Sequence, residues 1–343
     1  MDDLKSQTDD RKFESVDITL RVMLSSKRSA FTLVELLVTV AVIAILASLL
    51  LGALYSAQDS ARAQKTRSTI AKLHTMMTQR WESYKTRRVP ITVPAGTRPA
   101  DAALMRLTAI RELMRLELPD RNSDILVGQP AAGLNLTRFT SIGSTGATVD
   151  VPWPSLNAAY RRKLGAPTPA DTQFQAAECL FIILTTSIDD DTEGVERFGD
   201  SEIGDKDGDG RREFKDAWGN PISWVRWPAG FVSELQNSDP VVNHDPFDPR
   251  RVQAGAYALF PLIFSPGPDA EYEIRSLLQD GAGDELNYLG TKVKDMPGTT
   301  GNPKSGIMDP YAFTPLLGSA NDQDGDGVND SVDNIHNHLI GSR

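Results

Sequence analysis

The chain has 343 residues, a formal net charge of −10 at pH 7 and a single cysteine. Asp and Glu concentrate in the C-terminal half, which argues against nucleic acid as a partner of that half. One cysteine excludes an intrachain disulfide, so cysteine usage does not identify the redox compartment. Cys179 opens the apolar stretch 179–184, and we expect it to be a buried packing residue.

Residues 1–30 precede the first apolar stretch and change in character along their length. The first part is acidic and has no targeting character, whereas Lys27 and Arg28 make the end basic. Met23 is an alternative start, which would leave the short basic leader Met-Leu-Ser-Ser-Lys-Arg-Ser-Ala. We therefore interpret residues 1–30 as a leader, with Met23 as the alternative start.

An apolar run extends from Leu36 to Leu54, with Thr39, Ser48 and Gly52 as mild interruptions. A run of about 19 residues is long enough to cross a bilayer core of about 30 Å as a helix. A lone strand would leave its backbone polar groups unsatisfied in lipid. The alternative is a cleavable signal peptide, whose apolar region is usually about 7–15 residues long and ends at a small-residue cleavage site. No clean site of that kind closes this run, so the sequence favours a membrane anchor.

A single carboxylate, Glu35, stands at the front of this run. An acid at the centre of a membrane span costs about 2.5 to 3.5 kcal/mol on insertion scales, and less toward the end. An ionisable residue in such a segment is therefore a functional hypothesis that requires a partner.

Residues 27–54 closely resemble the N-terminus of type IV prepilins and type II secretion pseudopilins. The resemblance implies that a prepilin peptidase cuts between Ala30 and Phe31 and N-methylates Phe31. The family usually has glycine before the cut, where this chain has Ala30. The resemblance also implies that Glu35 pairs with the Phe31 ammonium of a neighbouring subunit, so that both charges enter an apolar filament core compensated. The implied partners are the peptidase, other pilin or pseudopilin subunits, and membrane lipid around residues 31–54.

The resemblance implies a single-pass protein of the inner (cytoplasmic) membrane with an extracytoplasmic, periplasmic C-terminal domain. Positive charges do not support this orientation when they are simply counted, because cytoplasmic flanks of a span are usually the more basic ones. Two basic residues precede the span and four follow it closely: Lys27, Arg28, Arg62, Lys65, Arg67 and Lys72. The cleavage-site match is the more specific signal, and we follow it.

After Leu54 no proline or glycine occurs before Pro90. Apolar residues recur there in steps of three and four, which predicts one helical stripe: Ile70, Leu73, Met77, Trp81 and Tyr84. We expect residues 31–54 to form a transmembrane and filament-core helix that continues through 55–89 on a globular domain. The resemblance implies an α+β, pilin-like fold with a long N-terminal helix packed on a small antiparallel sheet. Two regions would add to it, an insertion over 90–200 and calcium-type loops.

Further elements are expected along the rest of the chain. Helices are predicted over 100–118, Ser155–Leu164 and Phe174–Leu184, the last capped by Asp171, and strands over Ile222–Trp227 and Ala256–Ser265. Residues 131–151 are expected to form loops or short strands. We divide the remainder into a pseudopilin-like sheet region, 201–295, and a linker with a C-terminal tail, 296–343.

Two acidic loops follow the spacing of a twelve-residue calcium loop, with oxygen donors at positions 1, 3, 5, 7, 9 and 12 and glycine at position 6. The first consists of Asp205, Asp207, Asp209, Arg211 through its carbonyl, Glu213 and Asp216. The second consists of Asp322, Asp324, Asp326, Val328 through its carbonyl, Asp330 and Asp333. A hard cation that needs six to eight oxygens would explain the crowding of carboxylates.

Position 12 of both loops is Asp rather than a bidentate Glu, and strong flanking helices are absent. Calcium-stabilised extracytoplasmic loops of weak affinity therefore fit better than a helix–loop–helix sensor. The alternative is a pair of acidic, glycine-rich turns that bind nothing. The sequence favours calcium as a structural ion.

Two further segments, 214–222 and 264–269, look like turns of the major pseudopilin's sheet. Asp216-Ala-Trp-Gly-Asn-Pro resembles its Asp-Pro-Trp-Gly-Asn-Pro turn, with Ala217 in place of the proline, and Ser265-Pro-Gly-Pro-Asp resembles its Ser-x-Gly-x-Asp turn. In that family calcium also braces this C-terminal region.

Motifs of the common enzyme classes are absent: the sequence holds no G-x-S-x-G, H-E-x-x-H, P-loop or G-x-G-x-x-G. His336 and His338 could bind a transition metal, but we expect a solvated pair near the C-terminus. The sequence therefore predicts a pilus or pseudopilus subunit rather than an enzyme. The alternative is a monomeric, membrane-anchored, extracytoplasmic binding module that depends on calcium.

Overall fold

The structure is a computed structural model that describes residues 31–89, 91–126, 136–139, 149–152, 154–164, 173–186, 196–276, 278–279, 285–286, 310–311, 316–320 and 333–339. Its residues form two compact units, one up to Gln58 and one from Asp59 onward. The predicted leader, the linker around 296–305 and the first eleven positions of the second acidic loop lie outside the described residues.

Helix α2 runs without a break from Leu33 to Ser83 and spans 51 residues. The absence of proline and the scarcity of glycine let the backbone hydrogen bonds continue along this whole segment. Every residue from Phe31 to Gln58 is exposed. The helix is long and apolar enough to cross a membrane, with a mean hydropathy of 2.8 over its most apolar window. The predicted continuation of the apolar segment into a long helix is confirmed.

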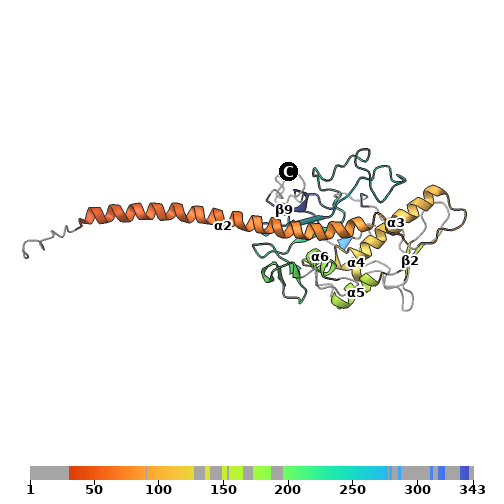
Figure 1. Ribbon diagram of the computed structural model, residues 1–343, viewed down its shortest axis with the longest axis horizontal. Coiled ribbons are helices and arrows are strands. Elements are labelled where there is room, and N and C mark those ends of the chain that lie inside the picture. Colours follow the sequence, from red (N-terminus) through yellow and green to blue (C-terminus); the bar gives the residue numbers. More distant parts are fainter. Residues whose placement is uncertain are drawn as a thin grey trace, which may run out of the picture. The chain divides into compact units, whose positions relative to one another are not determined.

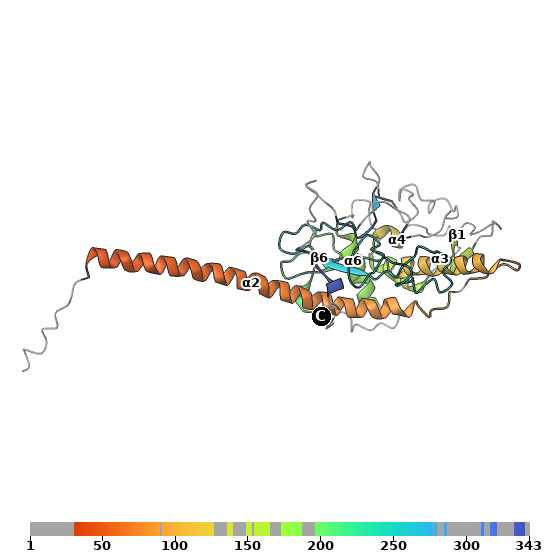
Figure 2. The same cartoon turned by 90° about the horizontal axis from the view of Figure 1, so that it is seen from above.

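The second half of α2 buries the predicted stripe. Ile70, Leu73, Met77 and Trp81 are at most 2 % exposed. Beyond the end of the helix, Tyr84 is also buried, and its hydroxyl donates a hydrogen bond to Glu117 over 2.6 Å. In the unit from Asp59 onward, this part of α2 runs beside the strands β6 (Leu262–Ser265) and β9 (Ile335–His336) (Figure 1 and Figure 2).

Four shorter helices follow: α3 (Pro99–Glu117), α4 (Asn122–Leu126), α5 (Ser155–Leu164) and α6 (Gln175–Thr185). Three of them match predicted helices within a residue or two, because proline before a helix and proline or glycine after it are local signals. The N-cap of α6 is Phe174, a non-glycine residue at φ 58°. Asp171, the predicted cap, lies outside the described residues.

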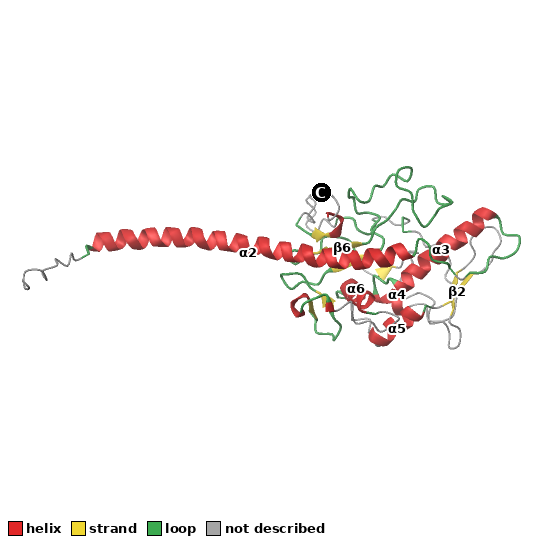
Figure 3. Cartoon of the chain, viewed as in Figure 1, coloured by secondary structure: helices red, strands yellow, loops and turns green. Residues whose placement is uncertain are grey.

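The strands are short, and loops make up much of the unit from Asp59 onward (Figure 3). The main sheet is antiparallel, in the order β5 (Ser223–Val225), β6 (Leu262–Ser265) and β9 (Ile335–His336). Three antiparallel pairs accompany it: β1 (Leu136–Phe139) with β2 (Val149–Pro152), β3 (Ile203–Gly204) with β4 (Glu213–Phe214), and β7 (Leu278–Gln279) with β8 (Glu285–Leu286). One-turn 3₁₀ helices lie at Asp200–Glu202 and Asn337–Leu339. The long N-terminal helix and small antiparallel sheets confirm the predicted α+β, pilin-like class.

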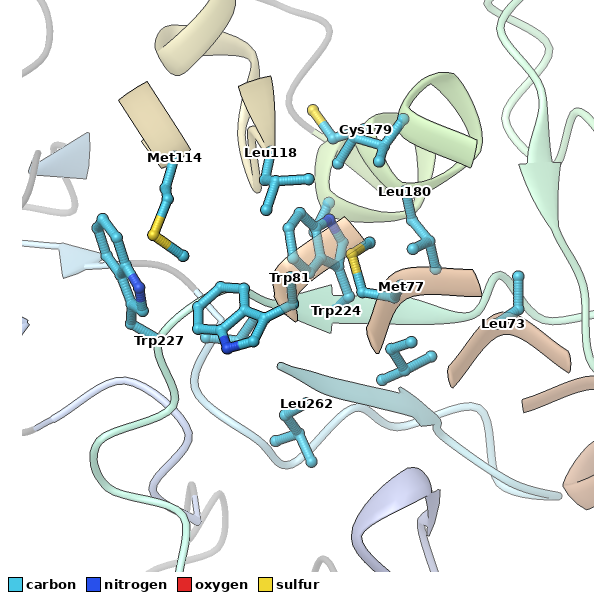
Figure 4. Close-up of a cluster of buried hydrophobic side chains, with 14 of the residues drawn as sticks. Leu73, Met77, Trp81, Met114, Leu118, Cys179, Leu180, Trp224, Trp227 and Leu262 are labelled. Atoms are coloured by element: carbon cyan, nitrogen blue, oxygen red, sulfur yellow. The ribbon is translucent and has the colours of Figure 1, made fainter. Parts of the chain in front are cut away.

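One hydrophobic core joins α2, the helices of the region 90–200 and the main sheet. Figure 4 shows side chains of this core from α2, from α3 and the residue after it, from α6 and from the sheet region: Leu73, Met77, Trp81, Met114, Leu118, Cys179, Leu180, Trp224, Trp227 and Leu262. Cys179 is fully buried, as expected. The region predicted as an insertion therefore contributes to the same core as the sheet.

A network of buried charges lies between α3, α4 and β5. The Arg226 guanidinium, which is fully buried, donates to the Leu118 carbonyl over 2.6 Å and to the Asp124 carboxylate over 3.0 Å. Arg115 donates to Asp124 over 3.1 Å and to Glu112 over 2.6 Å. Such pairs favour a single arrangement of these elements, because a buried charge is compensated only when its oppositely charged partner lies beside it.

The expectation that His336 and His338 are solvated is wrong. His336 lies in β9, and His338 is only 2 % exposed. Both imidazoles pack edge-on against Phe231, with ring centroids 5.0 and 5.2 Å away. The sequence near the C-terminus gave no sign that these residues add a strand to the edge of β6.

Candidate functional site

The N-terminal segment of the described chain begins with Phe31, one residue before the N-cap of α2. The Thr32 hydroxyl accepts a hydrogen bond from the Glu35 backbone N–H over 3.2 Å. A hydroxyl residue before the first turn with Glu three positions later is the pattern of a capping box. A carboxylate in the first turn also interacts favourably with the helix dipole. Thr32 and Glu35 therefore let the helix start directly after the predicted cleavage point. Ala30 lies outside the described residues.

The helix beyond this start presents apolar side chains on all sides. The large aliphatic residues from Leu33 to Leu54 are each at least 50 % exposed. A contiguous apolar surface of this kind marks a membrane or protein interaction segment. The short polar side chains of this segment form hydrogen bonds with the backbone of their own helix: the Thr39 and Ser48 hydroxyls each donate to the carbonyl three residues earlier.

The first acidic loop connects β3 to β4 and folds around Asp205. Its carboxylate accepts backbone hydrogen bonds from Gly208 over 2.6 Å and from Gly210 over 2.9 Å. Gly208 and Gly210 have φ values of +79° and +90°, which residues with a side chain rarely adopt. The predicted glycine at position 6, Gly210, therefore has the turn conformation that the spacing requires.

The structure brings some of the predicted ligands of this loop together and adds one. Carboxylate oxygens of Asp205, Asp207 and Asp209 lie within 4.8 Å of one another. A second group with the same spacing consists of Asp207, Glu213 and Glu178, and Glu178 belongs to α6 rather than to the loop. Among these residues, sequence spacing missed only Glu178, which is the sole charged residue of α6.

Asp216, the predicted position-12 ligand, belongs to neither group. One of its oxygens accepts from the backbone N–H groups of Trp218 and Asn220 over 2.9 and 2.8 Å, and the other from the Ser265 hydroxyl over 2.7 Å. Its carboxylate thus holds the turn 216–220 against β6. Both segments of this contact were singled out by their resemblance to pseudopilin turns.

The Arg211 side chain reaches the carboxylates of the loop. Its Nη1 lies 3.1 Å from a Glu178 oxygen and 3.4 Å from an Asp209 oxygen. The carbonyl of Arg211 as the position-7 ligand stays a prediction.

Of the second acidic loop only Asp333 is described; Asp322, Asp324, Asp326, Val328 and Asp330 lie outside the described residues. Carboxylate oxygens of Asp333, Asp269 and Glu273 lie within 4.8 Å of one another. Burial and the neighbouring Asp269 raise the pKa of Asp333 above its usual range. Calcium at this place stays a prediction.

Residues 25–51 match the family model of the prokaryotic N-terminal methylation motif. Comparison with curated proteins and with solved structures found no match. The motif includes the start of the long apolar helix α2, and the two together fit a prepilin-like protein; the motif indicates a precursor of the type IV pilin or pseudopilin kind. The motif match spans Ala30, Phe31 and Glu35, the residues on which the sequence resemblance rests.

Proposed function

We propose that this protein is a structural subunit of a type IV pilus-like filament or a type II secretion pseudopilus, and that it is not an enzyme. The observation that carries the proposal is the methylation motif at residues 25–51 together with an apolar helix whose residues up to Gln58 are all exposed. An apolar helix exposed over this length needs lipid before assembly and other subunits after it.

In this proposal a prepilin peptidase cuts between Ala30 and Phe31 and methylates the new amino group. Glu35 then compensates the Phe31 ammonium of a neighbouring subunit, so that register along the filament is set by a charge pair in an apolar surrounding. Residues 31–54 anchor the chain in the inner membrane before assembly, and the domain from Asp59 onward lies on the periplasmic side.

The test combines processing and assembly of the full chain expressed with a prepilin peptidase. Mass spectrometry of the membrane-extracted protein should find an N-methylated Phe31 as the mature N-terminus. Electron microscopy and sedimentation of sheared surface material should find wild-type filaments. The Glu35→Gln variant should be cleaved at the same bond, with filament yield lowered at least about tenfold, because loss of one buried charge leaves the other uncompensated.

Glu82→Gln is the matched control, since Glu82 lies on the same helix with its side chain 58 % exposed. It should assemble as the wild type does. A stable membrane protein that retains Met1 or Met23 would contradict the proposal and favour a monomeric anchored binding module. Wild-type yield from Glu35→Gln would contradict the assigned role of Glu35.

A further inference from the structure

Two carboxylates are buried where α6 packs on β4. Glu178 of α6 and Glu213 of β4 are both fully buried. The helix and the strand are held in contact by aromatic packing, with the rings of Phe181 and Phe214 centred 5.1 Å apart. Oxygens of Glu178 and Glu213 lie within 4.8 Å of each other and of the exposed Asp207 in the β3–β4 loop. The packing of α6 on β4 therefore places three carboxylates close together.

Each buried carboxylate has one oxygen whose hydrogen-bonding capacity is unmet. Glu178 Oε2 accepts from Arg211 over 3.1 Å, and Glu213 Oε2 accepts from the Lys206 backbone N–H over 3.2 Å. Glu178 Oε1 and Glu213 Oε1 are buried and have no hydrogen-bond partner among the described residues. Burying a carboxylate without full compensation is strongly unfavourable, so these oxygens indicate a ligand.

The charges in the cluster do not balance. Glu178, Asp207 and Glu213 together carry three negative charges when ionised, and the Arg211 guanidinium supplies one positive charge. Arg211 also contacts Asp209, so part of its charge compensates a carboxylate outside these three. At least two negative charges therefore remain on Glu178, Asp207 and Glu213, which one divalent cation would compensate.

Burial, as the largest cause, together with nearby carboxylates that include Asp207, raises the pKa of Glu178 to about 7 and that of Glu213 to about 8. The ionised cluster is therefore unfavourable without a cation. A bound metal ion is often the largest local charge in a site, and its positive charge favours the ionised form of the carboxylates around it.

We propose that Glu178, Asp207 and Glu213 bind one calcium ion, with water and backbone carbonyls of the loop as further ligands. The ligand atoms are all oxygens, which hard cations prefer. Calcium–oxygen distances of about 2.3 to 2.6 Å put opposite ligands up to about 5 Å apart, which the cluster's spacing accommodates. The irregular set, drawn from a helix, a loop and a strand, suits the flexible geometry of calcium better than the near-ideal octahedron of magnesium.

The ion would join the region 90–200 to the sheet region. Glu178 stands near the start of α6, whereas Asp207 and Glu213 belong to the β3–β4 hairpin. Without a cation the carboxylates of α6 and of the β3–β4 hairpin repel each other. A calcium ion coordinated by both elements would hold them together. The site differs from the loop predicted from sequence, because Glu178 takes the place that the spacing had assigned to Asp216.

The test measures calcium binding and thermal unfolding of the full chain in detergent. Titration calorimetry with CaCl₂, MgCl₂ and MnCl₂ gives affinity and stoichiometry after EDTA treatment, and scanning calorimetry gives the Tm with CaCl₂ or EDTA. Calcium at 100 times its Kd should raise the wild-type Tm by about 5 °C or more. Glu178→Gln and Asp207→Asn should each remove one calcium from the stoichiometry or weaken its binding at least about tenfold.

Glu234→Gln is the matched control, because Glu234 is an exposed glutamate outside the three acidic groups. It should bind calcium as the wild type does.

In EDTA the Glu178→Gln variant should melt no lower than the wild type, since it loses a repulsive charge. If Arg211 alone compensates Glu178, Glu178→Gln will instead melt lower in EDTA and calcium will not shift the wild-type Tm. That result overturns the proposal. Equal calcium stoichiometry and affinity in wild type and Asp207→Asn also overturns it, even if Glu178→Gln does not fold, and tighter magnesium or manganese binding overturns the choice of calcium.

Discussion

Single side chains in this protein acquire their properties from contacts that lie far away in sequence. His338 is 2 % exposed; its Nδ1 lies 2.8 Å from the Ser233 hydroxyl, and its Nε2 lies 3.3 Å from the Pro261 carbonyl. Burial, as the largest cause, together with the neighbouring His336 and His74, lowers the pKa of His338 to about 4. The fold therefore holds this imidazole neutral.

We expect this neutral imidazole to make the domain sensitive to acid. Well above pH 6.5, His338 is neutral in both the folded and the unfolded state, so the full contribution of the neutral imidazole to the free energy of unfolding is present. As the pH falls from 6.5 toward about 4, the unfolded state takes up the proton first, and the free energy of unfolding falls by up to about 1.4 kcal/mol per pH unit. Chemical denaturation at pH 7 and pH 5 should find a smaller pH effect in His338→Gln. An unchanged pH effect would contradict the assignment. The remaining pH effect combines His74 and His336, whose pKa values burial lowers, with Glu178 and Glu213, whose pKa values burial raises.

At the scale of elements, α2 is one helix with two environments. Leu46 in its first half is 54 % exposed, whereas Leu73 in its second half is fully buried. Both positions are helical leucines, so intrinsic helix propensity does not distinguish them. The buried half owes its stability to packing against the core, and the exposed half is suited to lipid or to other subunits.

Leucine-to-alanine changes at these two positions form a matched pair. Leu73→Ala should lower the free energy of unfolding of the domain by about 2 to 5 kcal/mol, because it leaves a cavity in the core. Leu46→Ala should change it by less than about 0.5 kcal/mol. Denaturant titration of tryptophan fluorescence in detergent measures both values, and similar losses from the two variants would contradict the division of α2.

At the scale of the whole molecule, the boundary between the two compact units falls between Gln58 and Asp59. The first residues beyond this boundary already contact the domain. The Asp59 carboxylate accepts from the Trp218 indole N–H over 3.0 Å, and the Thr66 hydroxyl accepts from the Ala217 backbone N–H over 3.1 Å. The domain therefore includes the C-terminal half of α2.

We expect a fragment that begins at Asp59 to fold without detergent and to unfold cooperatively at the same temperature as the domain in the full chain. A fragment that begins at Lys85 lacks Ile70, Leu73, Met77 and Trp81 and should be aggregated or unfolded, because their burial completes the core. Circular dichroism and size-exclusion chromatography test both fragments. A folded, monomeric fragment from Lys85 would show that α2 is dispensable for the domain.

The sequence by itself determined the features that depend on local pattern. Hydrophobic continuity and period predicted α2, its span and its buried stripe, and proline and glycine positions predicted α3 and α5. The methylation motif was readable for the same reason, since it is one short linear segment, residues 25–51.

Only the tertiary structure decided which polar side chains meet. Loop spacing brought Asp205, Asp207 and Asp209 into one candidate site, but it assigned Asp216 to a role that the turn against β6 already occupies. Glu178 entered the cluster through the packing of α6 on β4, and His338 became buried because β9 joins the sheet. Burial and charge compensation act through space, so residues far apart in the sequence decide them, and no linear pattern encodes that proximity.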